Sequence, residues 1–268
     1  MKEVCIVIPV YKDKLSGAEE ASFRRTLSVL SEYDTLIVCP EGLDTTAYTS
    51  IAGEKSLYFK TFAPSYFSGT EGYNRLLLSK EFYQPFSDYR YILICQLDAY
   101  VFRDELLEWC SKGYDFIGAP LVGHYTDTAF SPAMRVGNGG FSLRKVETAL
   151  HFFASRRNVF NAGQICRRID IWKKPWTRIF VWGLMMLGWH NKPQIVADRW
   201  RHNEDDFWSG LLSDSNYALR LPSPSEAMRF SFERFPKELY EMTGHALPFG
   251  CHAWEKYQFE EFWKGKIK

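Results

Sequence analysis

The sequence predicts an α/β protein whose core is a largely parallel β-sheet with helices on both faces. The first half of the chain contains continuous apolar runs at residues 4–10, 35–40 and 91–102, as expected for strands that are covered on both faces. Helix-type patterns lie between these runs. Strands and helices that alternate at this pace are typical of parallel sheets built from βαβ units.

The first apolar run, VCIVIPV, predicts the first strand. Ser16 and Glu19 follow it with the spacing of a capping box, in which each side chain accepts a hydrogen bond from the other residue's backbone N–H. Apolar residues then recur at helical spacing, namely Phe23, Leu27 and Leu30. We therefore expect a helix directly after the first strand.

The second run, TLIVCP, predicts a strand over residues 35–40. Ser68 and Glu71 repeat the capping-box spacing and predict a helix that continues through GYNRLLLSKEFY. The third run, YILICQLDAYVF at residues 91–102, predicts a further strand. A helix near 103–111 and the short strand YDFIGAP are expected after it.

Composition favours one domain over residues 1–268. Hydrophobic residues make up 46% of the chain and aromatic residues 17%, which is enough for one substantial core. The formal net charge is only +1, so the chain as a whole does not have the basic character of a nucleic-acid-binding protein. We expect no nucleic-acid partner.

Targeting signals and cysteine usage favour a cytoplasmic protein. Pro9 interrupts the N-terminal apolar stretch too early for a convincing signal peptide, and the longest mostly apolar run, 179–189, is too short to cross a bilayer. The six cysteines include no CxxC pair and no metal-type spacing. Cys5, Cys39 and Cys95 lie in apolar runs, which predicts small buried residues in a reducing compartment.

Residues 155–201 differ from the rest of the chain. They contain ten Lys or Arg and two Asp, although the whole chain has a net charge of only +1. The segment also contains five tryptophans, at positions 172, 176, 182, 189 and 200. We expect a basic, aromatic helical excursion near 155–200. One interpretation is a subdomain with a Trp core and solvated cations; the other is an acceptor platform or a peripheral membrane-contact patch.

Asp98 is the carboxylate that interrupts the apolar run at 91–102. In open α/β sheets, ligands bind beyond the carboxyl ends of the strands, and Asp98 is expected at such an end. The alternative interpretation is the polar end of a strand that meets solvent.

The stretch RVGNGGFSLRK contains three glycines, Gly137, Gly139 and Gly140, which permit close approaches that a side chain would block. Its spacing fits neither a P-loop nor a dinucleotide fingerprint. Taken alone, it is typical of an ordinary glycine-rich turn.

Three consecutive carboxylates, Glu204, Asp205 and Asp206, lie between Trp200 and Trp208. Acidic runs usually mark helix N-termini, where the helix dipole favours negative charge. An acid beside aromatic surface could instead have a raised pKa and act as a general base. Both interpretations remain open from the residues themselves.

Taken together and in this order, these stretches resemble the GT-A glycosyltransferases, nucleotide-sugar-dependent enzymes with a Rossmann-like sheet. The matching stretches are IVIPVYK, QLDAYVF in the place of the Asp-x-Asp motif, GNGGFSLRK, NEDDFW in the place of a Glu-Asp motif, and FGCHAW. The nearest resemblance is to a bacterial group of glycosyltransferase-like domains with QLDAY and GNGGFSLR. It covers nearly the whole chain, and it implies a donor half at 1–120 and an acceptor half at 121–268.

The resemblance implies a hexosyltransferase-type enzyme that moves a sugar from a nucleotide sugar, a UDP-sugar, to a hydroxyl of a glycan or glycolipid, with inversion. Asp205 would be the catalytic base. The acceptor side would comprise Glu204, Asp206, Gly139, Gly140 and Trp208. The donor side would comprise Pro9, Tyr11, Arg75, Asp98 and Tyr100.

One departure from the family pattern concerns the metal. Tyr100 replaces the second acid of Asp-x-Asp, whereas a Mn²⁺ or Mg²⁺ ion needs several oxygen ligands. Asp98, His252 and the donor diphosphate could hold the ion. In a metal-free mechanism, Arg75 would offset the diphosphate charge. The alternatives are a solvated Arg75 on a helix face and a half-buried structural imidazole at His252.

Two other functions stay open. A nucleotidyltransferase shares the same sheet and pocket but needs more metal carboxylates. A carbohydrate- or nucleotide-binding domain without activity would fit the loss of the second acid.

Overall fold

The computed structural model describes residues 1–123, 130–131, 134–168, 175–186 and 191–267. A six-stranded sheet in the order β3-β2-β1-β4-β9-β6 forms its centre. The strands are β1 (Lys2–Pro9), β2 (Thr35–Pro40), β3 (Leu57–Phe62), β4 (Tyr89–Cys95), β6 (Phe116–Gly118) and β9 (Phe141–Lys145). Strand β9 is antiparallel to β4 and β6, and the other neighbours are parallel. The expected mostly parallel α/β sheet is confirmed.

Strand β1 shows why the buried strands are continuously apolar. Val4, Ile6 and Ile8 belong to one buried cluster, while Cys5 and Val7 belong to another. Because successive side chains point to opposite faces of a sheet, these are two cores, one on each face. Cys5, Cys39 and Cys95 are buried in them, as expected.

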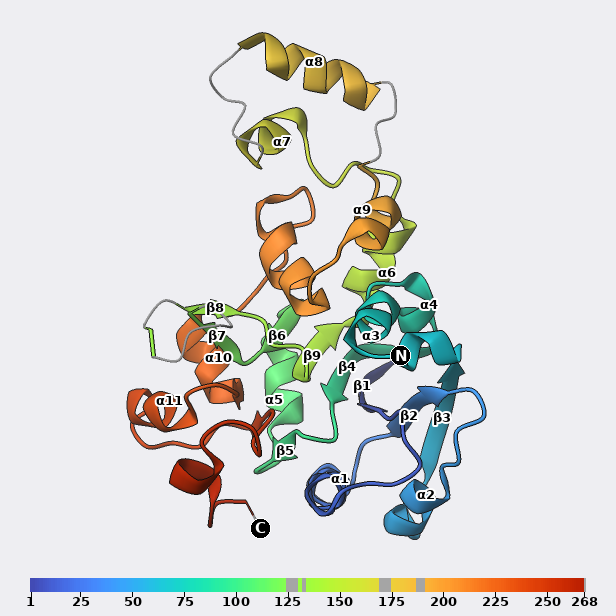
Figure 1. Ribbon diagram of the computed structural model, residues 1–268, viewed down its shortest axis with the longest axis vertical. Helices are drawn as coiled ribbons and strands as arrows, with labels where there is room; N and C mark the ends of the chain where they lie inside the picture. Colours follow the sequence, from blue (N-terminus) through green and yellow to red (C-terminus); the bar gives the residue numbers. More distant parts are fainter. Residues whose placement is uncertain (124–129, 132–133, 169–174, 187–190, 268) are drawn as a thin grey trace.

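Helices cover both faces of the sheet (Figure 1). The α-helices of the described chain are α1 (Gly17–Val29), α2 (Thr46–Ala52), α3 (Thr70–Leu77), α4 (Lys80–Tyr83), α5 (Leu106–Ser111), α6 (Val146–Ala154), α7 (Ala162–Arg168), α8 (Pro175–Met186), α9 (Pro193–Arg199), α10 (Pro224–Phe230) and α11 (Pro236–Met242). Two smaller sheets complete the fold. One pairs β7 (Pro120–Val122) with β8 (Met134–Val136), and the other has the order β10 (Ser231–Phe232), β11 (Gly250–Cys251), β5 (Tyr100–Val101).

The two predicted capping boxes had different outcomes. Ser16 and Glu19 form both hydrogen bonds of the box at the start of α1, so this prediction is confirmed. The prediction of a capping box at Ser68 and Glu71 is wrong, because Gly69 is the N-cap of α3. The Ser68 hydroxyl donates a hydrogen bond to the Ser65 carbonyl instead. A left-handed conformation at Gly69 (φ 92°) starts the helix one residue later.

The run at residues 91–102 forms two strands rather than one. Strand β4 ends at Cys95, a turn follows, and β5 then pairs with β11 in a different sheet. The Ala99 N–H donates to the Gln96 carbonyl, which closes this turn around Asp98. Asp98 therefore lies beyond the carboxyl end of β4, where the sequence predicts a ligand-binding residue.

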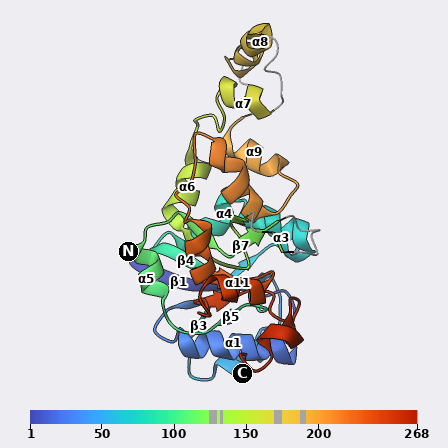
Figure 2. The same cartoon turned by 90° about the vertical axis from the view of Figure 1, so that its left-hand side faces the viewer.

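The basic segment projects from the body of the protein. Helices α7 and α8 form the end of the molecule farthest from α1, and both views agree on this (Figures 1 and 2). Trp172 and Trp189 lie outside the described residues. In the described parts of the chain, no helix is both long and apolar enough to cross a membrane.

Candidate active site

A cavity of about 450 Å³ opens beyond the carboxyl ends of β1 and β4. The chain runs from β1 to β2 and β3 on one side and then returns to place β4 on the other side of β1, which makes this edge the topological switch point of the sheet. The cavity is lined by Pro9, Tyr11, Glu19, Phe67, Gly69, Thr70, Tyr73, Gln96, Leu97 and Asp98. Three of the five expected donor residues, Pro9, Tyr11 and Asp98, thus line one pocket.

The other two expected donor residues lie elsewhere. Tyr100 is 3% exposed, and its ring packs against Phe102 and Trp254 in a buried cluster. It therefore points into the core instead of the cavity. Arg75 is exposed on α3 and is not part of the cavity lining. The solvated helix-face interpretation of Arg75 matches this position.

His252 connects the cavity to the protein interior. Its Nε2 atom lies 3.3 Å from an Asp98 carboxylate oxygen and 3.1 Å from the Gln96 side-chain oxygen, and its Nδ1 atom lies 3.1 Å from a Glu233 oxygen. Burial alone lowers the pKa of His252, but Asp98 and then Glu233 outweigh it and raise the pKa to about 10. Two carboxylates thus flank one imidazole.

The glycine-rich stretch packs where no side chain would fit. A Cβ atom at Gly140 would overlap the His252 ring, and one at Gly139 would overlap a Glu204 carboxylate oxygen. The Gly140 carbonyl also accepts a hydrogen bond from the Gln96 N–H, at 2.9 Å. These glycines bring the acidic run close to the end of β4.

Glu204 is held by a buried arginine. Arg144 donates from both terminal nitrogens to the two Glu204 oxygens, at 2.8 and 2.7 Å, and both side chains are at most 5% exposed. Although burial alone lowers the pKa of Arg144, Glu204 raises it above its usual range. This bidentate pair fixes Glu204 and positions the acidic run. An acceptor contact of Glu204 stays a prediction.

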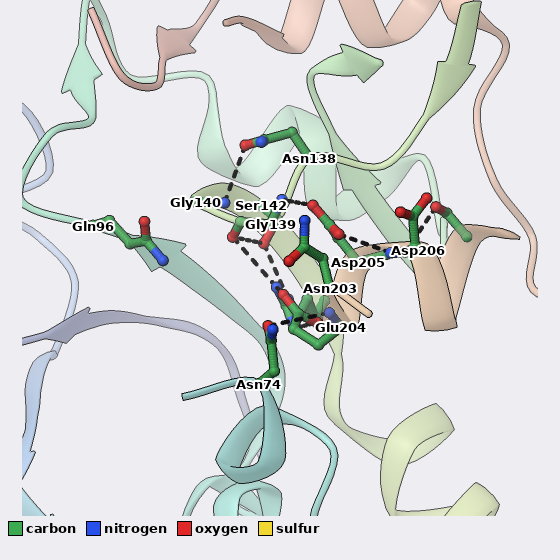
Figure 3. Close-up of polar contacts among 12 residues, drawn as sticks. Asn74, Gln96, Asn138, Gly139, Gly140, Ser142, Asn203, Glu204, Asp205 and Asp206 are labelled. Atoms are coloured by element: carbon green, nitrogen blue, oxygen red, sulfur yellow. Dashed lines mark hydrogen bonds and ion pairs between the residues drawn. The ribbon is translucent and has the colours of Figure 1, made fainter. Parts of the chain in front are cut away.

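Asp205 is buried as well, but it has no arginine or lysine beside it among the described residues. One oxygen accepts from the Gly139 N–H at 3.1 Å and the other from the Asp206 N–H at 2.8 Å (Figure 3). The residue is 6% exposed. Burial, followed by the charge of Glu204, raises the pKa of the Asp205 carboxyl to about 7.

Asp206 and Trp208, the last two residues expected on the acceptor side, lie in different environments. Asp206 is half-buried, with a carboxylate oxygen 3.1 Å from Arg135, and it lines a second hollow of about 730 Å³ together with Trp200 and His202. Trp208 is 3% exposed and packs edge-on against aromatic rings, namely Tyr83, Phe152, Phe153 and Phe207. It is a core residue, because the π-helical turn Asp206–Gly210 directs it into the cluster on that face of the sheet.

Sequence reasoning missed four polar residues of the site. Gln96 lies two positions before Asp98, directly after the same strand. That position could have identified it as a residue of the site. Arg144 lies in the strand FSLRK at the end of the glycine-rich stretch, and a cation within a strand of the central sheet signals a buried partner. The Asn138 side chain accepts a hydrogen bond from the Gly140 N–H, and Glu233 contacts His252. No sequence pattern marks either residue.

Comparison with solved structures identifies the fold. The protein is similar to mouse xyloside xylosyltransferase 1 in its apo form, with a TM-score of 0.51 and 14% identity over 93% of this chain and 97% of that one. It also matches the galactosyltransferase LgtC in complex with donor and acceptor sugar analogs, with a TM-score of 0.48 and 12% identity over 92% and 86% of the two chains. A glycosyltransferase involved in glycosylation of the major capsid of PBCV-1 matches with a TM-score of 0.39 and 12% identity over 98% and 100%. The expected GT-A fold is confirmed.

No curated protein matches the sequence. A family model does, over residues 56–252, which is more than half of the chain and includes the end of β4, the glycine-rich stretch, the acidic run and His252. The chain therefore belongs to the family described as Protein of unknown function (DUF5672).

Proposed function

We propose that the protein is a hexosyltransferase that moves a sugar from a nucleotide sugar, a UDP-sugar, to a hydroxyl of a glycan or lipid-linked glycan, with inversion. One observation carries the proposal: a buried carboxylate, Asp205, whose pKa is about 7, is joined by direct contacts to a cavity at the switch point of the sheet. The contacts run from Asp205 to Gly139, and from Gly140 to His252 and Asp98.

The cavity has the features that a nucleotide diphosphate requires. Tyr11 is 61% exposed at its rim, where an aromatic ring can stack on a base. Gly69 and Thr70 line it at the start of α3, and helix N-termini favour phosphate groups. The positive potential of this helix N-terminus would offset the diphosphate charge, which is the role that the sequence analysis gives to Arg75. Asp98 remains available for the donor ribose or for a metal.

The residues also fit a divalent cation, Mn²⁺ or Mg²⁺. With Nδ1 of His252 beside Glu233 and Nε2 beside Asp98, a cation that displaced the Nε2 proton would meet a nitrogen ligand next to a carboxylate, and Glu233 would be the carboxylate partner of the imidazole. Among the described residues, no group of three or more His, Cys, Asp or Glu side chains is placed to hold a metal. Asp98 and His252 would therefore share the ion with diphosphate oxygens. When bound, the ion would offset negative charge on the leaving diphosphate.

Asp205 supplies the base in this mechanism. The acceptor oxygen attacks the anomeric carbon, the bond from that carbon to the diphosphate oxygen breaks, and an Asp205 oxygen takes the hydroxyl proton. A carboxylate has about four lone-pair sites, so the two backbone N–H groups leave room for the acceptor hydroxyl. A pKa of about 7 suits a base near neutral pH, because enough of it is ionised and it still binds a proton well.

Calorimetric titration with nucleoside diphosphates and a panel of nucleotide sugars, with and without Mn²⁺, tests the donor part. Donor hydrolysis and transfer to a panel of glycans then test turnover. We expect binding of a UDP-sugar and release of UDP. Binding without any turnover would instead favour an inactive binding domain, and release of pyrophosphate from a nucleoside triphosphate would favour a nucleotidyltransferase. Absence of nucleotide binding would refute the proposal.

A further inference from the structure

Helix α8 is apolar on two opposite faces. Val181 is 4% exposed and belongs to the same buried cluster as Ile165 and Cys166 of α7. The other face carries four large apolar side chains that are 58–70% exposed: Trp176, Ile179, Phe180 and Trp182. At 100° per residue these four lie within one half of the helix circumference, away from Val181. In the described part of the chain, the Val181 face packs against α7, and the large side chains of the other face are mostly exposed.

The position of α8 makes the exposed face accessible. The helix projects with α7 from the end of the molecule (Figures 1 and 2). Among the described elements, it makes extensive contacts only with α7. Contiguous apolar groups of this kind on a protein surface mark an interaction site.

The net charge of the segment that contains α8 identifies the kind of partner. Residues 155–201 contain ten Lys or Arg and two Asp. The cations Arg156, Arg157, Lys192 and Arg199 are exposed. A second copy of this chain would bring the same positive charge against it, whereas an anionic surface would be attracted. Tryptophan and phenylalanine on a short helix within a basic segment suit the interface of an anionic bilayer.

We propose that α8 docks the protein on an anionic lipid bilayer, with Trp176, Ile179, Phe180 and Trp182 in the headgroup region and the net positive charge of residues 155–201 attracting this end of the molecule to the lipid phosphates. The helix has 12 residues and lies in the interface plane; it does not span the bilayer. The contact is peripheral and weakens with salt, because part of the attraction is screened charge. This inference does not depend on sugar transfer.

Co-sedimentation of the full chain with vesicles tests the proposal. Vesicles of phosphatidylcholine alone are compared with phosphatidylcholine containing phosphatidylglycerol, at low and high salt, without donor or acceptor. We expect binding only to the anionic vesicles, with a blue shift of tryptophan fluorescence. The double variant Ile179→Ser/Phe180→Ser should bind about tenfold more weakly, as should Arg156→Glu/Arg157→Glu.

Leu107→Ser is the matched control, because Leu107 is 54% exposed on α5, on the body of the molecule. It should bind like the wild type, and circular dichroism should show all variants folded. Equal binding to neutral and anionic vesicles, or none to either, would overturn the proposal. So would a dimer in sedimentation equilibrium that the Ile179→Ser/Phe180→Ser variant dissociates, since the face would then be covered by a second copy.

Discussion

Substitution of Asp205 by Asn removes the charge and the proton acceptor while keeping the shape. Donor affinity should stay near the wild-type value, because Asp205 lies outside the donor cavity lining. Turnover should fall by roughly 10²–10⁴-fold, the range for loss of a general base. In the wild type, kcat/KM should rise with pH through about 7, as the carboxyl ionises, and this rising limb should be absent from any residual activity of the variant.

The same substitution has a measurable effect on stability. The rise in the pKa of Asp205 from 3.8 to about 7 means that the folded state holds this proton more tightly than the unfolded state does. That contribution is complete below pH 3.8 and is lost as the pH rises through 7. At pH 8 the wild type therefore bears the cost of a buried charge, on the order of 4 kcal/mol.

An asparagine side chain at this position would avoid the cost of the buried charge. It would leave one of two backbone N–H groups, at Gly139 or Asp206, without its acceptor, which costs about 1–3 kcal/mol. The net expectation is that Asp205→Asn stabilises the protein at pH 8 by about 1–3 kcal/mol, and that at pH 5 it has little effect or destabilises the protein slightly. Urea unfolding at the two pH values measures the difference. Asp214→Asn, at a carboxylate that is about half exposed beside Arg167, is the control.

Two results would refute the assignment of the base. One is near-wild-type turnover by a folded Asp205→Asn protein on an acceptor that the wild type uses. The other is a variant that is less stable than the wild type at pH 8 and equally so at pH 5, since a buried carboxyl with a raised pKa requires a pH-dependent difference.

Three further predictions concern the surrounding residues. Asp98→Asn should weaken UDP-sugar binding by about 1.5–3 kcal/mol in calorimetry, the value of a charge-assisted hydrogen bond, and unchanged affinity would exclude Asp98 from the donor site. Gly140→Ala should displace the adjacent imidazole and lower the affinity for UDP with Mn²⁺, whereas Gly17→Ala, which meets no atom within 4 Å, should not; equal affinities would contradict the packing argument. Arg144→Met should lower the free energy of unfolding by about 3–5 kcal/mol in urea, because it leaves Glu204 buried without its partner, and a loss below about 1 kcal/mol would contradict this.

Sequence patterns predicted the parts of the fold in which burial imposes a regular pattern on consecutive residues. The strands at Lys2–Pro9 and Thr35–Pro40 are continuous apolar runs, and burial on both faces of a sheet produces such runs. Strand β3 (Leu57–Phe62) was missed, because it lies at the sheet edge with a mostly exposed or half-buried pattern. The break after Cys95 was missed because both strands of that run are buried, although in different sheets.

The direction of a side chain was harder to predict than its position in the chain. Asp98 and Tyr100 are two residues apart, yet the turn between β4 and β5 places one at the cavity and the other in a buried aromatic cluster. Trp208 likewise stands beside the acidic run but points into the core. Partners such as Glu233, which lies in a distant part of the chain, come together only in the folded protein.

The three consecutive acids show how neighbouring residues of one type acquire different chemistry. Glu204 is paired with Arg144, and Asp206 lies 3.1 Å from Arg135. Of the three, Asp205 alone forms no ion pair among the described residues, and it is buried beside the negative charge of Glu204. The arginines therefore leave Asp205 as the acid of this run whose electrostatics fit a general base.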